Sequence, residues 1–196
     1  MRVIAGIYRS RSIWAPEGLD TRPTSDRLRE TIFNVLAPVI DGARFLDLYA
    51  GSGAVGIEAL SRGAAHVTFV ESNKKAVRTI RENLKALGIA SGADLIEREA
   101  TKALAHLAAS AADGAKPFDI VFLDPPYAAE GQYDAALTAL SASPLISAET
   151  IVIAEHTKHF SPNDSYAQMT VYRRMQQGDA ALAFYRRAAN DSAPPQ

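Results

Sequence analysis

The sequence predicts an α/β fold in which helices cover both faces of a mostly parallel sheet, with a C-terminal antiparallel hairpin and a small N-terminal β-hairpin extension. Three observations predict it. The 196 residues are 47% hydrophobic and 22% charged, which suits one domain with a buried core. From Arg44 onward, short apolar runs alternate with helical patterns, as in right-handed βαβ units. Two apolar runs near the C-terminus are separated only by a short turn that contains glycine.

The chain is expected to begin with a short hairpin. Strands near Arg2–Ile7 and Arg11–Ala15 would be joined at Arg9-Ser10, after which prolines and a glycine interrupt the pattern. We therefore expect an N-terminal β-hairpin extension (1–23), a main domain (24–189) and a disordered tail (190–196).

The main domain is expected to open with a helix that Thr24 or Ser25 caps and that Pro38 ends. Its apolar face is Leu28, Ile32, Val35 and Leu36. Further strands are expected at Phe45–Tyr49, His66–Val70, Leu95–Glu97, Phe118–Leu123 and Ile151–Glu155. Further helices are expected at Ala54–Arg62, Asn73–Leu87, Thr101–Ser110 and Gln132–Ser141. The closing hairpin pairs Ala167–Met175 with Ala181–Arg187 around Gln176–Asp179.

Composition excludes several kinds of chemistry. The chain has no cysteine, so it forms no disulfide, no thiolate metal site and no cysteine nucleophile. The four histidines show no metal-ligand spacing, and we expect no metal. The net charge is −1, so a nucleic-acid partner would have to be held by local patches, such as the arginine-rich ends of the chain. No signal peptide or membrane segment is evident, and we expect a soluble, cytoplasmic monomer.

A glycine-rich turn follows the first expected strand of the sheet. Gly51 and Gly53 allow the backbone to turn tightly and to approach a ligand, and the next helix points its free N–H groups at that ligand. Glu71 ends the following strand, where an acid can accept both hydroxyls of a ribose. The pattern predicts a nucleoside-type cofactor, but Gly51-x-Gly53-x-x-Gly56 also matches a dinucleotide fingerprint, so the turn alone does not choose between cofactors.

The run Asp124–Tyr127 comes directly after the apolar strand Phe118–Leu123. Two prolines stiffen this loop at the carboxyl edge of the sheet, beside the glycine turn. The Asp124 side chain and the Pro125 carbonyl can accept hydrogen bonds from an exocyclic amine of a planar base, favouring the pyramidal geometry that nucleophilic attack requires. Tyr127 can stack on that base.

With these residues together, the sequence resembles the class I S-adenosylmethionine-dependent methyltransferases, which have a Rossmann-like sheet. More narrowly, it resembles the RsmD family of bacterial enzymes, which methylate N2 of a guanine in 16S rRNA of the small ribosomal subunit, at a position-966 type of site. The resemblance runs from Met1 to about Arg187. It rests on Arg2–Gly6, Arg22–Thr24, Leu46–Ala64, Phe69–Glu71 and Phe122–Tyr127.

The resemblance implies S-adenosylmethionine as cofactor and the 16S rRNA of a small subunit, or of its assembly intermediate, as partner. The target amine would be held by Asp124, Pro125, Pro126 and Tyr127. The cofactor would be held by Asp47, Tyr49, Gly51, Ser52, Gly53, Glu71, Ser72, Glu99, Ala100 and Thr24. RNA would contact Arg2, Arg9, Arg11 and Arg22.

Three alternatives remain open at this point. The amine could be adenine N6 or cytosine N4 of another nucleic acid, because the Asp124–Tyr127 motif suits any exocyclic amine. The protein could be a ribosome-assembly factor without catalytic activity. It could also be an NAD-dependent oxidoreductase, although no hydride-transfer residues accompany the glycine turn.

Overall fold

The computed structural model describes residues 1–16, 24–111, 114, 116–126 and 130–188. The expected domain boundary at residue 23 and the expected tail, 190–196, lie outside the described residues. Among the described residues, no helix is both long and apolar enough to cross a membrane.

One mixed sheet forms the centre of the molecule. Its strands lie in the order β3-β2-β1-β4-β5-β8-β7-β6. They are β1 (Arg44–Leu48), β2 (His66–Val70), β3 (Ala93–Ile96), β4 (Phe118–Leu123), β5 (Ile146–Thr157), β6 (Ser165–Tyr166), β7 (Met169–Gln177) and β8 (Ala180–Arg187). The first five are parallel, and β6, β7 and β8 pair antiparallel. The predicted α/β class, with a C-terminal antiparallel hairpin, is confirmed.

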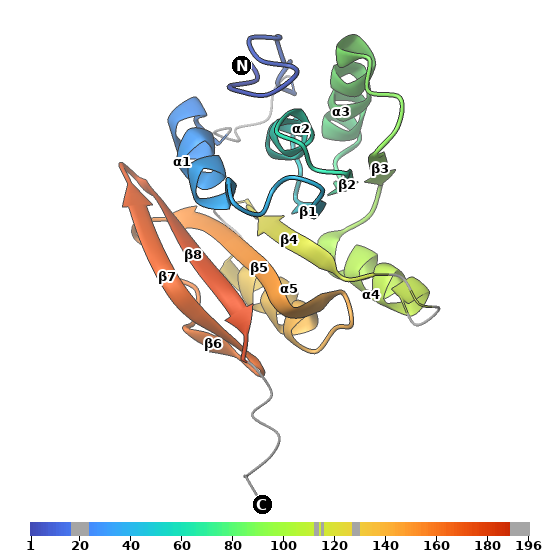
Figure 1. The fold of residues 1–196 in the computed structure, drawn as a ribbon. Coiled ribbons are helices and arrows are strands. Elements are labelled where there is room, and N and C mark those ends of the chain that lie inside the picture. The colour runs from blue at the N-terminus through green and yellow to red at the C-terminus, as the bar shows by residue number, and fades with distance from the viewer. Residues whose placement is uncertain (17–23, 112–113, 115, 127–129, 189–196) are drawn as a thin grey trace, which may run out of the picture.

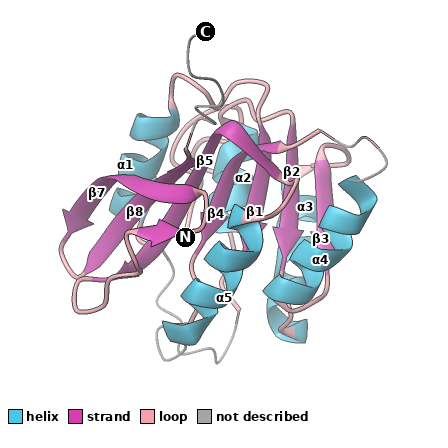
Figure 2. Ribbon diagram, turned by 90° about the horizontal axis from the view of Figure 1, so that it is seen from below, coloured by secondary structure: helices cyan, strands magenta, loops and turns pink. Residues whose placement is uncertain are grey.

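Helices cover both faces of this sheet (Figures 1 and 2). They are α1 (Asp26–Leu36), α2 (Ala54–Ser61), α3 (Lys74–Leu87), α4 (Ala100–Ala111) and α5 (Glu130–Ser141). The first three pack on one face around Phe33, Phe45 and Phe69, and the last two pack on the other face around Leu123 and Tyr133. Strand residues alternate between the two cores, because successive side chains of a strand point to opposite faces.

Local signals set the helix ends. Ser25 is the N-cap of α1 and accepts a hydrogen bond from the Leu28 N–H at 3.2 Å. Asn73 caps α3 in the same way, accepting from the Lys75 N–H at 2.9 Å. Gly88 ends α3 in the left-handed conformation, with φ of 74°, as its position in the sequence predicts.

The N-terminal prediction needs correction. The two expected strands reduce to a single antiparallel bridge between Arg2 and Ser12. The reason is that other acceptors take the backbone N–H groups of this segment. Ile4 and Ala5 donate to the carboxylate of Glu58 on α2, at 2.8 and 3.0 Å, and Ile7 donates to the carbonyl of Ser61 at 2.8 Å. The segment is therefore attached to α2 as well as paired across its own turn, where Val3 donates to the Arg11 carbonyl and Ile13 to the Met1 carbonyl, both at 2.9 Å.

The C-terminal half also differs in detail. Strand β5 begins five residues earlier than expected, at Ile146, with an irregularity opposite Phe118–Ile120. The hairpin turn shortens to Gly178 and Asp179, because β7 runs on to Gln177. The two-residue strand β6 was not expected, since two residues show no periodicity.

Candidate active site

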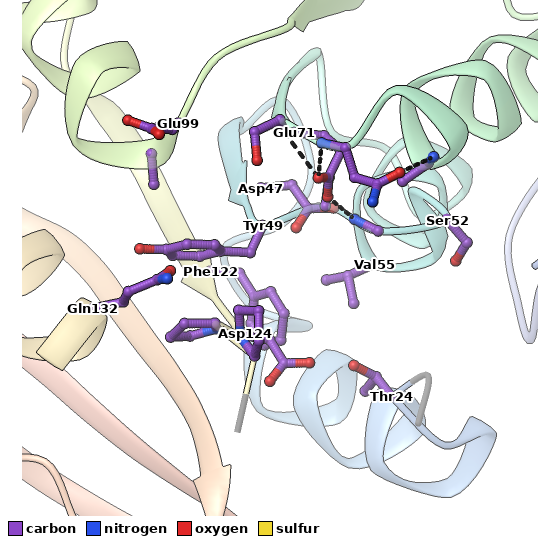
Figure 3. A pocket seen from close by; sticks show the side chains of 18 of the residues that line it. Thr24, Asp47, Tyr49, Ser52, Val55, Glu71, Glu99, Phe122, Asp124 and Gln132 are labelled. Atoms are coloured by element: carbon purple, nitrogen blue, oxygen red, sulfur yellow. Dashed lines mark hydrogen bonds between the residues drawn. The ribbon is translucent and has the colours of Figure 1, made fainter. Parts of the chain in front are cut away.

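The candidate site lies at the carboxyl ends of β1 and β4. The chain moves outward on one side from β1 to β3 and then returns to place β4 on the other side of β1. Such a reversal leaves a crevice above the strand ends. In the β1–β4 register Leu48 is opposite Leu123, so the turn after Leu48 and the loop after Leu123 leave the sheet side by side. A cavity of about 900 Å³ opens there (Figure 3).

The turn after β1 is held in an unusual backbone conformation. Tyr49, Gly51 and Gly53 all have positive φ, at 63°, 56° and 77°. Asp47, which is buried, accepts the Gly56 N–H at 2.9 Å and so fixes the first turn of α2 beneath the loop. A Cβ on Gly56 would lie 2.3 Å from the Phe69 ring, so glycine is required there for packing.

Glu71 forms one side of the cavity and is bound by backbone donors. Its carboxylate accepts the N–H of Gly51 at 2.8 Å, of Ser72 at 2.8 Å and of Asn73 at 2.7 Å. These contacts tie the end of β2 to the glycine turn (Figure 3). The acid is therefore held in one position, with its half-exposed side chain at the cavity wall.

Asp124 lies on another side of the cavity, facing Thr24 (Figure 3). Burial, the charge of Glu155 and the charge of Asp47 together hold the pKa of Asp124 well above its usual range. Glu155, on β5, is 1% exposed and accepts the Thr24 hydroxyl at 2.8 Å. Its pKa is raised to about 7, mainly by burial and against the opposing effects of the Thr24 hydrogen bond and the Arg29 charge.

Arg29 supports this end of the cavity from α1. The guanidinium is fully buried and donates to the carbonyls of Thr24, at 3.3 Å, and Arg2, at 2.8 Å. It also pairs with Asp26 at 2.9 Å. The buried guanidinium of Arg29 thus holds Thr24 in place, and Thr24 in turn donates its hydroxyl to Glu155.

The cavity as a whole is acidic. Burial raises the pKa of Asp47 to about 7, with the Gly56 N–H lowering it and the nearby Glu71 charge raising it further. Burial also raises the pKa of Tyr49 to about 12. An acidic cavity with an apolar floor, which includes Val55 and Phe122, suits a cationic ligand. Among the described residues, no cluster of histidines and acids could hold a metal ion.

Most of the residues expected at the site do line the cavity. They are Thr24, Asp47, Tyr49, Gly51, Ser52, Glu71, Ser72, Glu99, Ala100, Asp124, Pro125 and Pro126. Gly53 is not part of the lining, and it acts instead as the N-cap of α2. Tyr127 and Arg22 lie outside the described residues. Arg2, Arg9 and Arg11 are exposed and do not line the cavity.

Four buried residues that support the site were not expected from the sequence: Arg29, Glu58, Asn83 and Glu155. Asn83 donates to the carbonyl of Ser52 in the glycine turn at 2.9 Å. Glu155 and Asn83 occur in ordinary strand and helix patterns, and their partners are 131 and 31 residues away. The one signal in the sequence for Glu155 and Asn83 is that each is a polar residue at a position where the pattern predicts burial.

Comparison with known proteins places this geometry in a family. Residues 1–186 match the family model described as "Conserved hypothetical protein 95". The chain is 39% identical over 187 residues to "Putative rRNA methyltransferase YlbH" of Bacillus subtilis, covering 95% of this chain and 99% of that protein. It is 34% identical over 189 residues to "Ribosomal RNA small subunit methyltransferase D" of Escherichia coli K12, covering 96% and 91%.

A solved structure supports the same family assignment. The structure named "Putative methyltransferase yhhF from Escherichia coli" superposes with a TM-score of 0.81 at 36% identity, covering 97% of this chain and 99% of that one. The agreement extends over nearly all of both chains, so it includes the N-terminal segment as well as the sheet.

Proposed function

This chain belongs to the family described as conserved hypothetical protein 95, the RsmD family, and we propose that it transfers a methyl group from S-adenosylmethionine to an exocyclic amine of small-subunit rRNA. The finer proposal is guanine N2 of 16S rRNA, at a site of the position-966 type. One observation carries the proposal: Asp124 and the glycine turn, with its Glu71 partner, line the same cavity at the β1–β4 switch.

The lining suits S-adenosylmethionine. We propose that Glu71 would accept the ribose hydroxyls, that Gly51 and Ser52 would hold the methionine portion, and that Glu99 and Ala100 would lie beside the adenine. All five residues line the cavity. The acidic walls favour the positive charge of a sulfonium. When bound, S-adenosylmethionine supplies an electrophilic methyl group, whose carbon–sulfur bond breaks as the amine nitrogen bonds to the carbon, leaving S-adenosylhomocysteine.

Asp124 orients the amine and receives its proton. An exocyclic amine is a poor nucleophile while its lone pair is delocalised into the ring. The Asp124 carboxylate and the Pro125 carbonyl accept its two N–H groups and so favour the pyramidal form. Once the nitrogen is methylated it carries a positive charge, and one proton passes to an Asp124 oxygen and then to solvent. Tyr127 is proposed to stack on the base.

Glu155 and Thr24 keep Asp124 ready for this step. Burial and the charge of Glu155 raise the pKa of Asp124, so Asp124 is suited to take up a proton from the methylated amine. The target amine has to reach a methyl donor inside the cavity, so the base must be splayed out of its stack. We propose that Arg2, Arg9, Arg11 and Arg22 help to hold the surrounding RNA by its phosphates.

The decisive experiment supplies labelled methyl donor with small ribosomal subunits that lack the modification. Mass mapping of the digested RNA should locate one methylated guanine, and Asp124→Ala should leave it unlabelled. Label on an adenine or a cytosine would refute the guanine assignment and favour the alternative amines. Calorimetry should find binding of S-adenosylhomocysteine and none of NADH, and the reverse result would indicate an oxidoreductase. An unlabelled subunit with normal S-adenosylhomocysteine binding would favour an assembly factor.

A further inference from the structure

A second hollow adjoins the candidate active site. It is an open groove of about 800 Å³ between the N-terminal segment, at Trp14 and Ala15, and the outer face of α3. The next residue, Pro16, lines the catalytic cavity, as do Asn73 and Ala76 on either side of Lys75. The groove therefore runs to the cavity mouth. We refer to it as the α3 groove.

The α3 groove is basic. Its charged lining consists of Lys75, Arg78 and Lys85 against one acid, Glu82. Within the described part of the chain, none of the three cations forms an ion pair with an acid. Lys75 and Arg78 are three residues apart on one helix face, where like charges repel and slightly destabilise a helix. A polyanion lying in the groove would neutralise them.

The groove also presents an exposed aromatic ring on a hydrogen-bonded backbone. Trp14 is 53% exposed and is the single tryptophan of the chain. Its backbone is held on both sides by Asn83, which accepts the Trp14 N–H at 2.8 Å and donates to the Trp14 carbonyl at 3.0 Å. Because Asn83 is fully buried and also binds Ser52, the backbone that carries the exposed indole is tied to the glycine turn.

We propose that the α3 groove binds the single-stranded RNA that flanks the target nucleotide, with one base stacked on Trp14 and phosphates held by Lys75, Arg78 and Lys85. Cations that follow a strand, with an aromatic on which a base can stack, are the two elements of sequence-tolerant single-strand binding. The position beside the cavity mouth is where a strand must pass when one of its bases enters. This inference rests on the proposed function, since it assumes an RNA substrate.

The single tryptophan makes stacking directly measurable. Intrinsic fluorescence of the full chain should be quenched on titration with a short oligoadenylate, with a midpoint equal to the dissociation constant from anisotropy of the same labelled oligonucleotide. Polyphosphate, which has charge but no bases, should bind with little quenching. Oligonucleotide binding without quenching, or equal quenching by polyphosphate, would overturn the stacking contact.

Variants test the two parts separately. Trp14→Ala should weaken oligoadenylate binding about tenfold, and Trp14→Phe should restore most of it. Lys75→Gln with Arg78→Gln should lower the slope of log affinity against log salt by about 1–2. Lys116→Gln, which removes an exposed cation two residues before β4, should leave the slope nearly unchanged. An unaltered slope in the double variant, or an equal loss with Lys116→Gln, would remove the groove from RNA binding.

Two further readouts separate this proposal from the proposed function. Binding of S-adenosylhomocysteine should be the same in all these variants, which also shows that they are folded. If wild-type protein methylates no RNA yet Trp14 is quenched by oligoadenylate, the groove proposal stands and the proposed function fails. If the variants lose methylation of subunits but bind oligoadenylate normally, the groove contacts a ribosomal protein instead, and the RNA proposal fails.

Discussion

The cavity has two acidic sides that the fold treats in opposite ways. Glu71 accepts three backbone N–H groups from the glycine turn and the start of α3. Asp124 lines the other side, and Glu155, which is buried and does not line the cavity, accepts the hydroxyl of Thr24. Donors that bind a carboxylate favour its charged form, whereas burial beside another acid disfavours it.

This difference in surroundings suggests that Glu71 serves ligand binding and Asp124 serves the chemical step. A carboxylate that accepts three backbone N–H groups is held in one position, which suits recognition of a ligand. Asp124 has a pKa raised by burial and by the charge of Glu155, so it takes up a proton more readily than an ordinary carboxyl, which suits proton transfer. Removing each acid in turn should therefore change different quantities.

The largest effect is expected from Asp124→Ala. Loss of the acceptor for the amine should lower kcat by about 10²–10³, as for removal of a group that stabilises developing charge. The dissociation constant of S-adenosylhomocysteine should stay within about twofold, because the cofactor contacts are elsewhere in the cavity. Single-turnover methylation and calorimetry measure the two. Unchanged turnover would show that Asp124 does not hold the amine.

Glu155→Gln should change the pH dependence of stability. The pKa of Glu155 is raised from 4.5 to about 7, so its contribution to stability is complete below about pH 4.5 and is lost as pH rises through about 7. The free energy of unfolding of the wild type should fall as pH rises over that range. In Glu155→Gln this decrease should be smaller, by up to about 3 kcal/mol. Denaturation at a series of pH values measures it.

The control for this prediction is Glu149→Gln, at an exposed position of β5. That variant should keep the wild-type pH dependence, because an exposed carboxyl is solvated in both the folded and the unfolded chain. If Glu155→Gln matched the wild type at every pH, the buried acid would not be the source of the dependence.

The smallest of the three effects is expected from Glu71→Gln. The amide keeps the size of the side chain but loses the charge that accepts three N–H groups, so S-adenosylhomocysteine should bind about tenfold more weakly. At saturating donor, kcat should fall less than threefold, in contrast to Asp124→Ala. A fall in kcat without a change in affinity would reverse the roles assigned to the two sides.

Local patterns predicted the elements that build the site. The glycine turn and the loop at Asp124 each follow a short apolar strand. The carboxyl ends of parallel strands lie at one edge of a sheet, so the two segments are expected to be close together. The glycine turn and the loop at Asp124, which were predicted to lie side by side, therefore line one cavity. The ends of most helices also followed from caps such as Asn73 and Gly88.

What the sequence did not show depends on long-range contacts. Glu155 occurs in an ordinary strand pattern, and Arg29 occurs in a helix where an arginine is usually exposed. Two short N-terminal strands around Arg9-Ser10 were predicted, but Glu58 and Ser61 bind several of the N–H groups that would have extended their pairing. In each case the deciding partner lies on another element, beyond the reach of periodicity.

The attachment of the N-terminus has a consequence for synthesis on the ribosome. The N-terminal segment binds Glu58 and Asn83, so it has no place to dock until α2 and α3 have been translated. Thr24 must wait for Glu155, 131 residues later, which at about 5–20 residues per second takes on the order of ten seconds. A nascent chain can thus complete its glycine turn while its proton-handling side stays open, and a truncated product ending before β5 would lack the acid that Thr24 binds.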